Sequence, residues 1–285
     1  MTPIVPRARA PLKAPSVLPG FAPTFSATLF YLAVVVLIPL GALIVKASSL
    51  GFGGIIAVAA EPRVLASLRV TFGIAIAAAL IDLLVGAVVA WALTRYSFPG
   101  RRIFDAMIDL PFALPTAVAG IALSTLYAPN GWLGAPLAKL GLKVAFTPLG
   151  ILVALVFVGL PFVVRTVQPV IEELDAEQEE ASATLGANRW RTIRHVLIPE
   201  LAPALLTGMA LAFARGVGEY GSVIFIAGNV PYVSEITPLL IVVKLEEYNY
   251  AGATAIAAIM LALSFAMLLV INSAQAWTRR SLGDV

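Results

Sequence analysis

The chain lacks cysteine altogether and has one histidine, His195, in 285 residues. Without cysteine it cannot form disulfides, thiolate metal sites or iron–sulfur clusters. A single histidine argues against a multi-histidine metal site and against a Ser-His-Asp hydrolase. Charge is scarce as well, because 12% of the residues are Asp, Glu, Lys or Arg, whereas soluble domains have about 25%. These absences exclude most soluble enzyme classes and direct attention to the hydrophobic residues.

Hydrophobic residues make up 60% of the chain, and its mean hydropathy is +0.95. We therefore predict an all-α integral membrane protein. A helix needs about 20 apolar residues to cross a bilayer core of about 30 Å. Six stretches meet this requirement, and the first is expected to be an uncleaved anchor. They are Phe25–Val45, Ser67–Leu93, Asp109–Tyr127, Val144–Leu160, Leu201–Ile226 and Ala251–Trp277.

Prolines modify two of the apolar segments. Pro111 and Pro115 are expected to kink the third span. The stretch Ile236–Val243 is too short to cross the membrane and contains Pro238. It is predicted to be a re-entrant or interfacial helix.

The basic residues set the orientation. With a cytoplasmic N-terminus, twelve of the nineteen Lys and Arg residues lie inside, six lie outside, and Arg215 lies within a span. This distribution fits the positive-inside rule. Both termini are therefore predicted to be cytoplasmic.

The cytoplasmic loop 168–199 contains the longest polar segment of the chain. It predicts a helix–turn–helix, with an acidic helix over Glu172–Leu185 and a turn at Gly186. Asn188 is a good N-cap for a second, basic helix over Arg189–Ile198, which the following proline closes. The apolar face of the second helix, formed by Trp190, Ile193 and Leu197, would suit a groove on another protein. A solvated amphipathic pair of helices with no partner is the alternative.

Charged residues inside predicted spans are the second feature of interest. Each costs about 2.5–3.5 kcal/mol on insertion scales, so such residues usually face a cavity or each other. Arg215 and Glu219 are four residues apart and share a helix face. Either Arg215 faces an anion and Glu219 orients it, or the two form a pair that locks the span. Asp82 is alone in the second span, and Arg215 is one candidate partner. Ser222 is a further candidate donor to an oxyanion.

The cytoplasmic loop resembles a known family. Glu180-Ala181-Ser182-Ala183-Thr184-Leu185-Gly186, nine further residues and then Val196-Leu197-Ile198-Pro199 are similar to the EAA loop of ABC-importer permeases. The sequence departs from the family pattern at Ser182, Val196 and Ile198. The resemblance implies that this loop is the coupling helix, which fits a groove on the ATPase subunit. The residues implied in coupling are Glu180, Ala181, Ser182, Gly186, Arg189, Trp190 and Pro199.

Three further segments resemble the sulfate/thiosulfate permeases of the CysT type. They are Arg215–Asn229, Pro111–Gly120 and Glu235–Ile241. Molybdate permeases share much of the fifth-span pattern. The resemblance covers about 25–280, which is expected to form one permease domain. Residues 1–24 are expected to be a disordered cytoplasmic tail, and 281–285 a C-terminal tail.

The resemblance implies a type I ABC-importer permease in the bacterial inner membrane, working by alternating access. The chain contains no G-x-x-x-x-G-K-[ST] motif, so ATP-Mg is expected on a separate ATPase dimer and no cofactor on this chain. The implied partners are that ATPase dimer, a second homologous (CysW-like) permease, an extracytoplasmic sulfate-binding protein and membrane lipid, with no nucleic acid. No catalytic constellation is present, so the chain itself is not expected to be an enzyme.

Three other functions are considered for the sequence. A molybdate or tungstate permease differs only in the oxyanion. An ion-coupled secondary transporter could use Asp82, Arg215 and Glu219 as a relay, but no internal repeat is evident. A structural membrane subunit is a third alternative, and the charges inside the spans argue against it.

Overall fold

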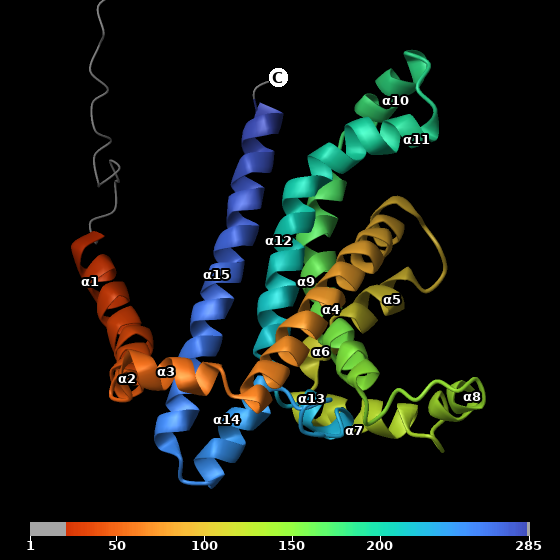
Figure 1. The fold of residues 1–285 in the computed structure, drawn as a ribbon. Helices are drawn as coiled ribbons and strands as arrows, with labels where there is room; N and C mark the ends of the chain where they lie inside the picture. The colour runs from red at the N-terminus through yellow and green to blue at the C-terminus, as the bar shows by residue number, and fades with distance from the viewer. Residues whose placement is uncertain (1–20, 284–285) are drawn as a thin grey trace, which may run out of the picture. The chain divides into compact units, whose positions relative to one another are not determined.

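The computed structural model describes residues 21–283, which contain helices and no strand (Figure 1). The chain divides into two compact units between Lys46 and Ala47. The described part of the first unit consists of α1 (Phe21–Leu32), the π-helical turn η1 (Ala33–Leu37) and most of α2 (Ile38–Ser48). Helix α1 begins at Phe21, so the last four residues of the predicted tail are helical, and the remainder of that tail lies outside the described residues.

The second unit contains the remaining elements. Its first half comprises α3 (Gly51–Ala59), α4 (Pro62–Arg95), α5 (Arg101–Ile108), α6 (Leu110–Ala113), α7 (Thr116–Tyr127), α8 (Gly134–Lys139) and α9 (Pro148–Glu173). Its second half comprises α10 (Ala176–Thr184), α11 (Arg189–Thr192), η2 (Ile193–Leu197), α12 (Ile198–Val217), α13 (Val223–Ile226), α14 (Thr237–Glu246) and α15 (Tyr250–Gly283). Helix α15 therefore continues into the predicted C-terminal tail.

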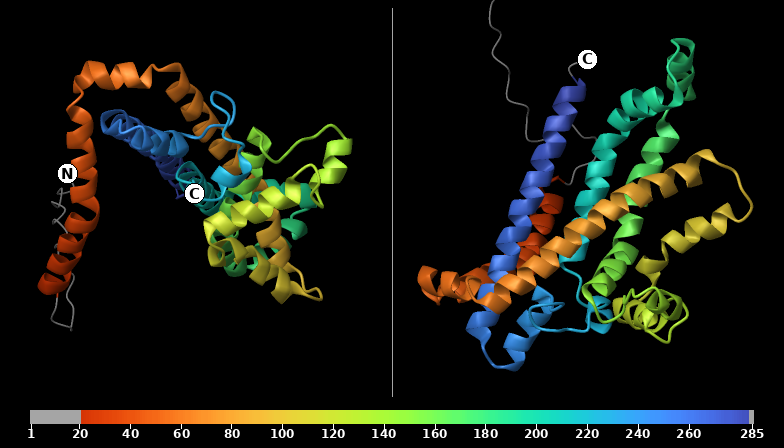
Figure 2. Two further views of the ribbon diagram at one scale, coloured as in Figure 1. Left: turned by 90° about the horizontal axis from the view of Figure 1, so that it is seen from below. Right: turned by 45° about the vertical axis from the view of Figure 1, so that its right-hand side comes forward.

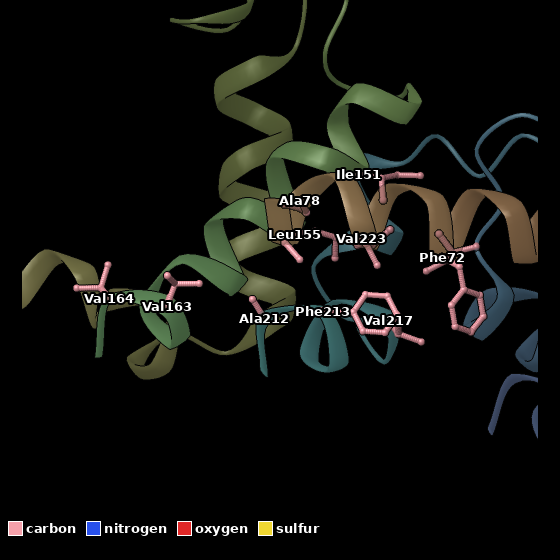
Figure 3. Close-up of a cluster of buried hydrophobic side chains, with 14 of the residues drawn as sticks. Phe72, Ala78, Ile151, Leu155, Val163, Val164, Ala212, Phe213, Val217 and Val223 are labelled. Carbon is pink, nitrogen blue, oxygen red and sulfur yellow. The ribbon is translucent and has the colours of Figure 1, made fainter. Parts of the chain in front are cut away.

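Helices α4, α9 and α12 form the core (Figure 3). Small residues let these helices approach closely, as is typical of helix packing in membranes. A side chain at Gly208 of α12 would meet the backbone of Val163 on α9, and one at Gly86 of α4 would meet the Val163 side chain. Val163 is fully buried where the three helices meet.

Within residues 21–283, five helices are long and apolar enough to cross a membrane: Phe21–Ser48, Pro62–Arg95, Pro148–Glu173, Arg189–Val217 and Tyr250–Ser273. The third predicted span, Asp109–Tyr127, differs from expectation, because it is divided into α6 and α7 instead of being one kinked helix, and α5 ends just before it. Leu114 is extended, with ψ of 135°. The ring of Pro115 disfavours helical geometry at the residue before it, which accounts for this break.

Two predicted helix ends are wrong. Helix α12 ends at Val217, and α13 follows as a separate short helix, so the fifth span does not continue to Ile226. Pro199 does not close the second loop helix either, because α11, η2 and α12 form one continuous helix. The Ile198 N–H donates to the carbonyl of Ile193 in the π-helical turn. This wider turn lets the chain pass the proline without ending the helix.

The second unit has two distinct ends. Helices α10 and α11 lie at the end toward which the C-terminal part of α15 points, and α7, α8, α13 and α14 lie at the opposite end (Figures 1 and 2). By the positive-inside argument, the first of these is the cytoplasmic end. The ten-residue α14, with Pro238 in its first turn, covers most of the short apolar stretch noted in the sequence. Its re-entrant or interfacial position remains a prediction.

Candidate functional site

A helix–turn–helix is present at the cytoplasmic end as α10 and α11, which we call the coupling hairpin (residues 176–198), but its first helix begins at Ala176 and not at Glu172, because α9 continues to Glu173. Gly186 has φ of +81°, a conformation that glycine adopts without steric cost. The Asn188 side chain accepts a hydrogen bond of 2.9 Å from the Arg191 N–H. The hydroxyls of Ser182 and Thr192 lie 2.7 Å apart and connect the two arms. The predicted turn and cap are therefore confirmed, and Ser182 links the two helices.

The hairpin presents apolar and charged groups to the outside. Glu180 is exposed, and Leu185 and Trp190 are 88% and 66% exposed. Leu197, expected on the same apolar face as Trp190, is buried in the core. A shallow groove of about 490 Å³ runs between the arms and is lined by Gln178, Ala181, Ser182, Leu185, Ala187, Arg191, His195 and Val196. The groove adds Leu185, Arg191 and His195 to the residues that the sequence singled out.

The other two coupling candidates have different surroundings. Arg189 is exposed, and no ion pair joins it to another part of the described chain. Pro199 is partly buried in the first turn of α12. Its position suits a role in shaping the helix more than a role in contacting a partner.

Arg95 fixes the hairpin to the core. This residue ends α4 and stacks over Trp91, with 5.3 Å between the guanidinium carbon and the ring centre. Its Nη2 lies 3.1 Å from a carboxylate oxygen of Glu179 on α10 and donates to the Leu174 carbonyl at 3.2 Å. In the sequence, Arg95 counted only as one of the twelve cytoplasmic basic residues. Its partners Leu174 and Glu179 lie 79 or more positions away and could not be predicted from spacing.

A charged cluster lies at the opposite end of α12. Arg215 and Glu219 form an ion pair, with Nη1 of Arg215 2.5 Å from Oε2 of Glu219. The other Glu219 oxygen accepts hydrogen bonds of 2.8 Å from both the backbone N–H and the hydroxyl of Ser222. The predicted pair is thus confirmed, although Glu219 lies just beyond the helix end.

Exposure distinguishes the members of this cluster. The Glu219 side chain is 1% exposed, whereas that of Arg215 is 33% exposed. Ser222 is fully buried, and its hydroxyl is used by Glu219, so it is not offered to an anion in this conformation. Arg215 contacts Glu219 through one terminal nitrogen, and a third of its side chain is exposed.

Asp82 does not join this cluster. It is 1% exposed, and neither carboxylate oxygen has a hydrogen-bond partner among the described residues. It lies against Gly159 of α9, where a side chain would collide with the carboxylate, and near Ala212 of α12. The candidate pairing with Arg215 is therefore not observed.

Two of the segments that resemble CysT-type permeases, Pro111–Gly120 and Arg215–Asn229, meet around Glu219. Gly120 of α7 packs directly on the backbone of Ser222, and Gly221 packs on Thr116. An added side chain at either glycine would collide with these neighbours. The segment that carries Glu219 is therefore supported by the first turns of α7.

The third such segment, Glu235–Ile241, is attached to α4 by hydrogen bonds at the same end of the unit. Glu235, which is 3% exposed, receives two hydrogen bonds from Arg63, at 2.8 and 2.7 Å. The Thr237 N–H donates to the Thr71 hydroxyl at 2.8 Å. The sequence analysis identified Glu235–Ile241 as a family-like segment but assigned it no partners.

Within 21–283, no three His, Asp or Glu side chains are placed to hold a metal ion.

Comparison with known proteins adds sequence and fold relationships. Residues 82–283 match the family described as the binding-protein-dependent transport system inner membrane component. The sulfate transport system permease protein CysT of Escherichia coli (strain K12) is 48% identical over 268 residues, covering 94% of this chain and 97% of that protein. The protein of the same name from Synechocystis is 49% identical over 257 residues, covering 90% of each.

Solved structures show the same fold at low identity. A bacterial ABC transporter involved in import of the acidic polysaccharide alginate superimposes with a TM-score of 0.74 at 13% identity, covering 90% of this chain and 94% of that chain. The MetNI methionine ABC transporter in an inward-facing conformation gives 0.54 at 19% identity, covering 78% and 98%.

Proposed function

The chain belongs to the binding-protein-dependent transport system inner membrane components, among the CysT-type sulfate permeases, and we propose that it forms the path for sulfate and thiosulfate in an ATP-driven importer. The observation that carries this proposal is the identity of 48–49% to sulfate permeases over 90% or more of this chain. The exposed coupling hairpin supports it from the structure. The chain is a permease subunit, and ATP hydrolysis is assigned to a separate subunit.

The proposed partners follow from the hairpin and from the family. Exposed Glu180, Leu185 and Trp190 would enter a groove on an ABC ATPase dimer. A second, CysW-like permease would complete the path, and an extracytoplasmic sulfate-binding protein would deliver the anion. The complex would reside in the bacterial inner membrane.

The attachment of the hairpin supports alternating access. Helix α9 ends two residues before α10, and α11 is continuous with α12. Two of the three core helices thus connect directly to the docking surface. When ATP closes the ATPase dimer, displacement of the hairpin would move α9 and α12 together and change which end of the path is open.

Arg215 is the proposed oxyanion residue. Its guanidinium forks suit the tetrahedral oxygens of sulfate, and the pair with Glu219 uses one terminal nitrogen of a side chain that is 33% exposed. Glu219, fixed by Ser222, would orient Arg215 and keep the anion from binding too tightly to be released. Asp82, which is buried without a hydrogen-bond partner among the described residues, is given no role in binding the anion.

Labelled sulfate uptake tests the substrate assignment. Cells lacking this chain would be compared with cells in which it is restored, with excess unlabelled thiosulfate or molybdate in parallel. We expect restored uptake that thiosulfate blocks and molybdate hardly affects. Uptake blocked by molybdate at equal excess would favour a molybdate or tungstate permease, and no dependence on the chain would refute the proposal.

A further inference from the structure

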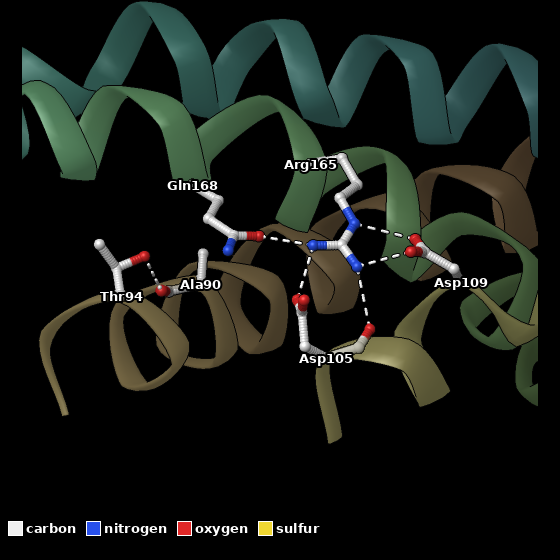
Figure 4. A network of polar contacts seen from close by, with 6 residues as sticks. All are labelled: Ala90, Thr94, Asp105, Asp109, Arg165 and Gln168. Carbon is white, nitrogen blue, oxygen red and sulfur yellow. Dashed lines mark hydrogen bonds and ion pairs between the residues drawn. The ribbon is translucent and has the colours of Figure 1, made fainter. Parts of the chain in front are cut away.

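Arg165 of α9 is surrounded by acceptors from a segment about 60 positions earlier in the chain (Figure 4). Its Nε and Nη2 donate to the two carboxylate oxygens of Asp109, at 2.8 and 2.7 Å. Its Nη1 donates to Asp105 Oδ1 and Gln168 Oε1, both at 2.7 Å, and Nη2 also donates to the Asp105 carbonyl at 2.9 Å. A guanidinium has five N–H donors, so each of them has an acceptor.

We propose that this group, which we call the Arg165 clamp (Asp105, Asp109, Arg165 and Gln168), transmits movement of the coupling hairpin to α5 and α6. Arg165 is then a positioning residue for transport. The inference rests on the proposed function, because it takes the hairpin as the site where the ATPase acts.

The segment held by the clamp is otherwise weakly attached. A cavity of about 300 Å³ with an apolar lining lies between α5, α4 and α9, bordered by Phe104, Met107 and Phe157 among others. Ile103, Phe104 and Met107 are each more than half exposed. The segment therefore has room to shift when its polar attachment is lost.

Both ends of the segment can act as hinges. Gly100, just before α5, has φ of +83°, and Leu114, just after α6, is extended. Such breaks concentrate a change in backbone angles in a few residues. The only aromatic contact between α6 and α9 is an edge-on pair of Phe112 and Phe162, with ring centres 5.1 Å apart, among the described residues.

The clamp lies close to the source of movement. Arg165 is eight residues before the end of α9 at Glu173, which is about 12 Å along a helix. Two residues then lead into α10. A displacement of the hairpin reaches Arg165 along α9, which is one continuous helix through Pro169, and the two carboxylates carry it to α5 and α6.

Loss of the clamp should impair transport more than folding. The side chains of Arg165, Asp105 and Asp109 are 31%, 41% and 48% exposed, and partly solvated ion pairs contribute little to stability. Their paired hydrogen bonds nevertheless fix orientation. The clamp therefore suits a role in geometry more than one in holding the fold together.

The first test compares Arg165→Gln with Arg102→Gln in the complete complex reconstituted in lipid vesicles. Arg102 is an exposed arginine of α5 with no ion pair to the described residues, so it is a matched control. We expect Arg165→Gln to lower sulfate uptake about tenfold while ATP hydrolysis changes much less, a typical size for a coupling residue. The control should transport normally. Equal uptake per ATP hydrolysed in both variants would overturn the proposal.

Charge exchange and distance measurements separate positioning from misfolding. The double variant Arg165→Asp with Asp109→Arg should recover part of the lost uptake. Because this chain has no cysteine, spin labels at Arg102→Cys on α5 and Glu172→Cys on α9 would be the only labels on it; labelled complex without these substitutions gives the background from the other subunits. We expect one narrow distance distribution with the clamp intact, with and without ATP, and a broadened one in Arg165→Gln.

An unchanged distribution in Arg165→Gln would also overturn the proposal. Failure of the proposed function looks different, because the unmutated complex would then show no ATP-dependent sulfate uptake. The spin-label distances do not depend on the identity of the substrate.

Discussion

At the scale of single residues, Glu219 illustrates how a buried charge is tolerated in an apolar chain. Its two oxygens receive one ion pair and two hydrogen bonds, from Arg215 and Ser222. The i, i+4 spacing allowed the Arg215–Glu219 pair to be predicted from sequence. The Ser222 contacts were not predicted, because the span was expected to continue to Ile226, whereas α12 ends at Val217 and leaves the Ser222 N–H free to bind the Glu219 side chain.

Glu219→Gln should reduce sulfate uptake severely at normal protein abundance. The amide removes the charge that orients Arg215 and brings a donor toward Ser222, whose N–H and hydroxyl already point there. Glu200→Gln is the matched control, because Glu200 is an exposed acid in the first turn of the same helix. Uptake and membrane abundance would be measured side by side, and equal uptake in the two variants would contradict the role given to Glu219.

Asp82→Asn should leave the thermal unfolding midpoint of the complex unchanged or raise it. An ionised carboxylate without a partner is costly to bury, and the amide has nearly the same size but no charge. Asp82→Leu is the contrasting variant, because its larger branched side chain would press on Gly159. A lower midpoint for Asp82→Asn would indicate that an ionised Asp82 makes a stabilising contact.

At the scale of elements, the sequence predicted turns and helix caps correctly where residues within the element determine them. Gly186 and Asn188 specified the hairpin turn and cap, which are present as expected. The third span was mispredicted as one kinked helix, because residue 114 is extended before Pro115. Pro199 was mispredicted as a helix end, because the π-helical turn before it absorbs the proline.

Glu180→Lys should abolish uptake while the chain remains inserted in the membrane at normal abundance. The substitution reverses charge at an exposed position of α10, on the surface proposed to meet the ATPase. Glu177→Lys, an exposed acid one turn earlier on the same helix, makes the same change nearer the core. Co-purification of the ATPase would be measured for both. Normal uptake by Glu180→Lys would remove that residue from the docking surface.

At the scale of the whole molecule, two polar systems lie at opposite ends of an apolar core. The coupling hairpin is fixed by Arg95 to α4, and the Arg215–Glu219 pair is supported by α7. The overall class and orientation could be predicted from composition and basic residues alone. Contacts between distant segments, such as Arg63–Glu235 and the Arg165 clamp, could not, because sequence spacing carries no information about them.

The central claim is that ATP hydrolysis on another subunit drives sulfate through this chain. It is tested most directly in vesicles containing the purified complex with its binding protein, by measuring labelled sulfate crossing the membrane with ATP, with a non-hydrolysable analogue, and without this chain. We predict crossing only with ATP and only when the chain is present. Sulfate crossing at an equal rate with the analogue, or in vesicles that lack the chain, would contradict the account.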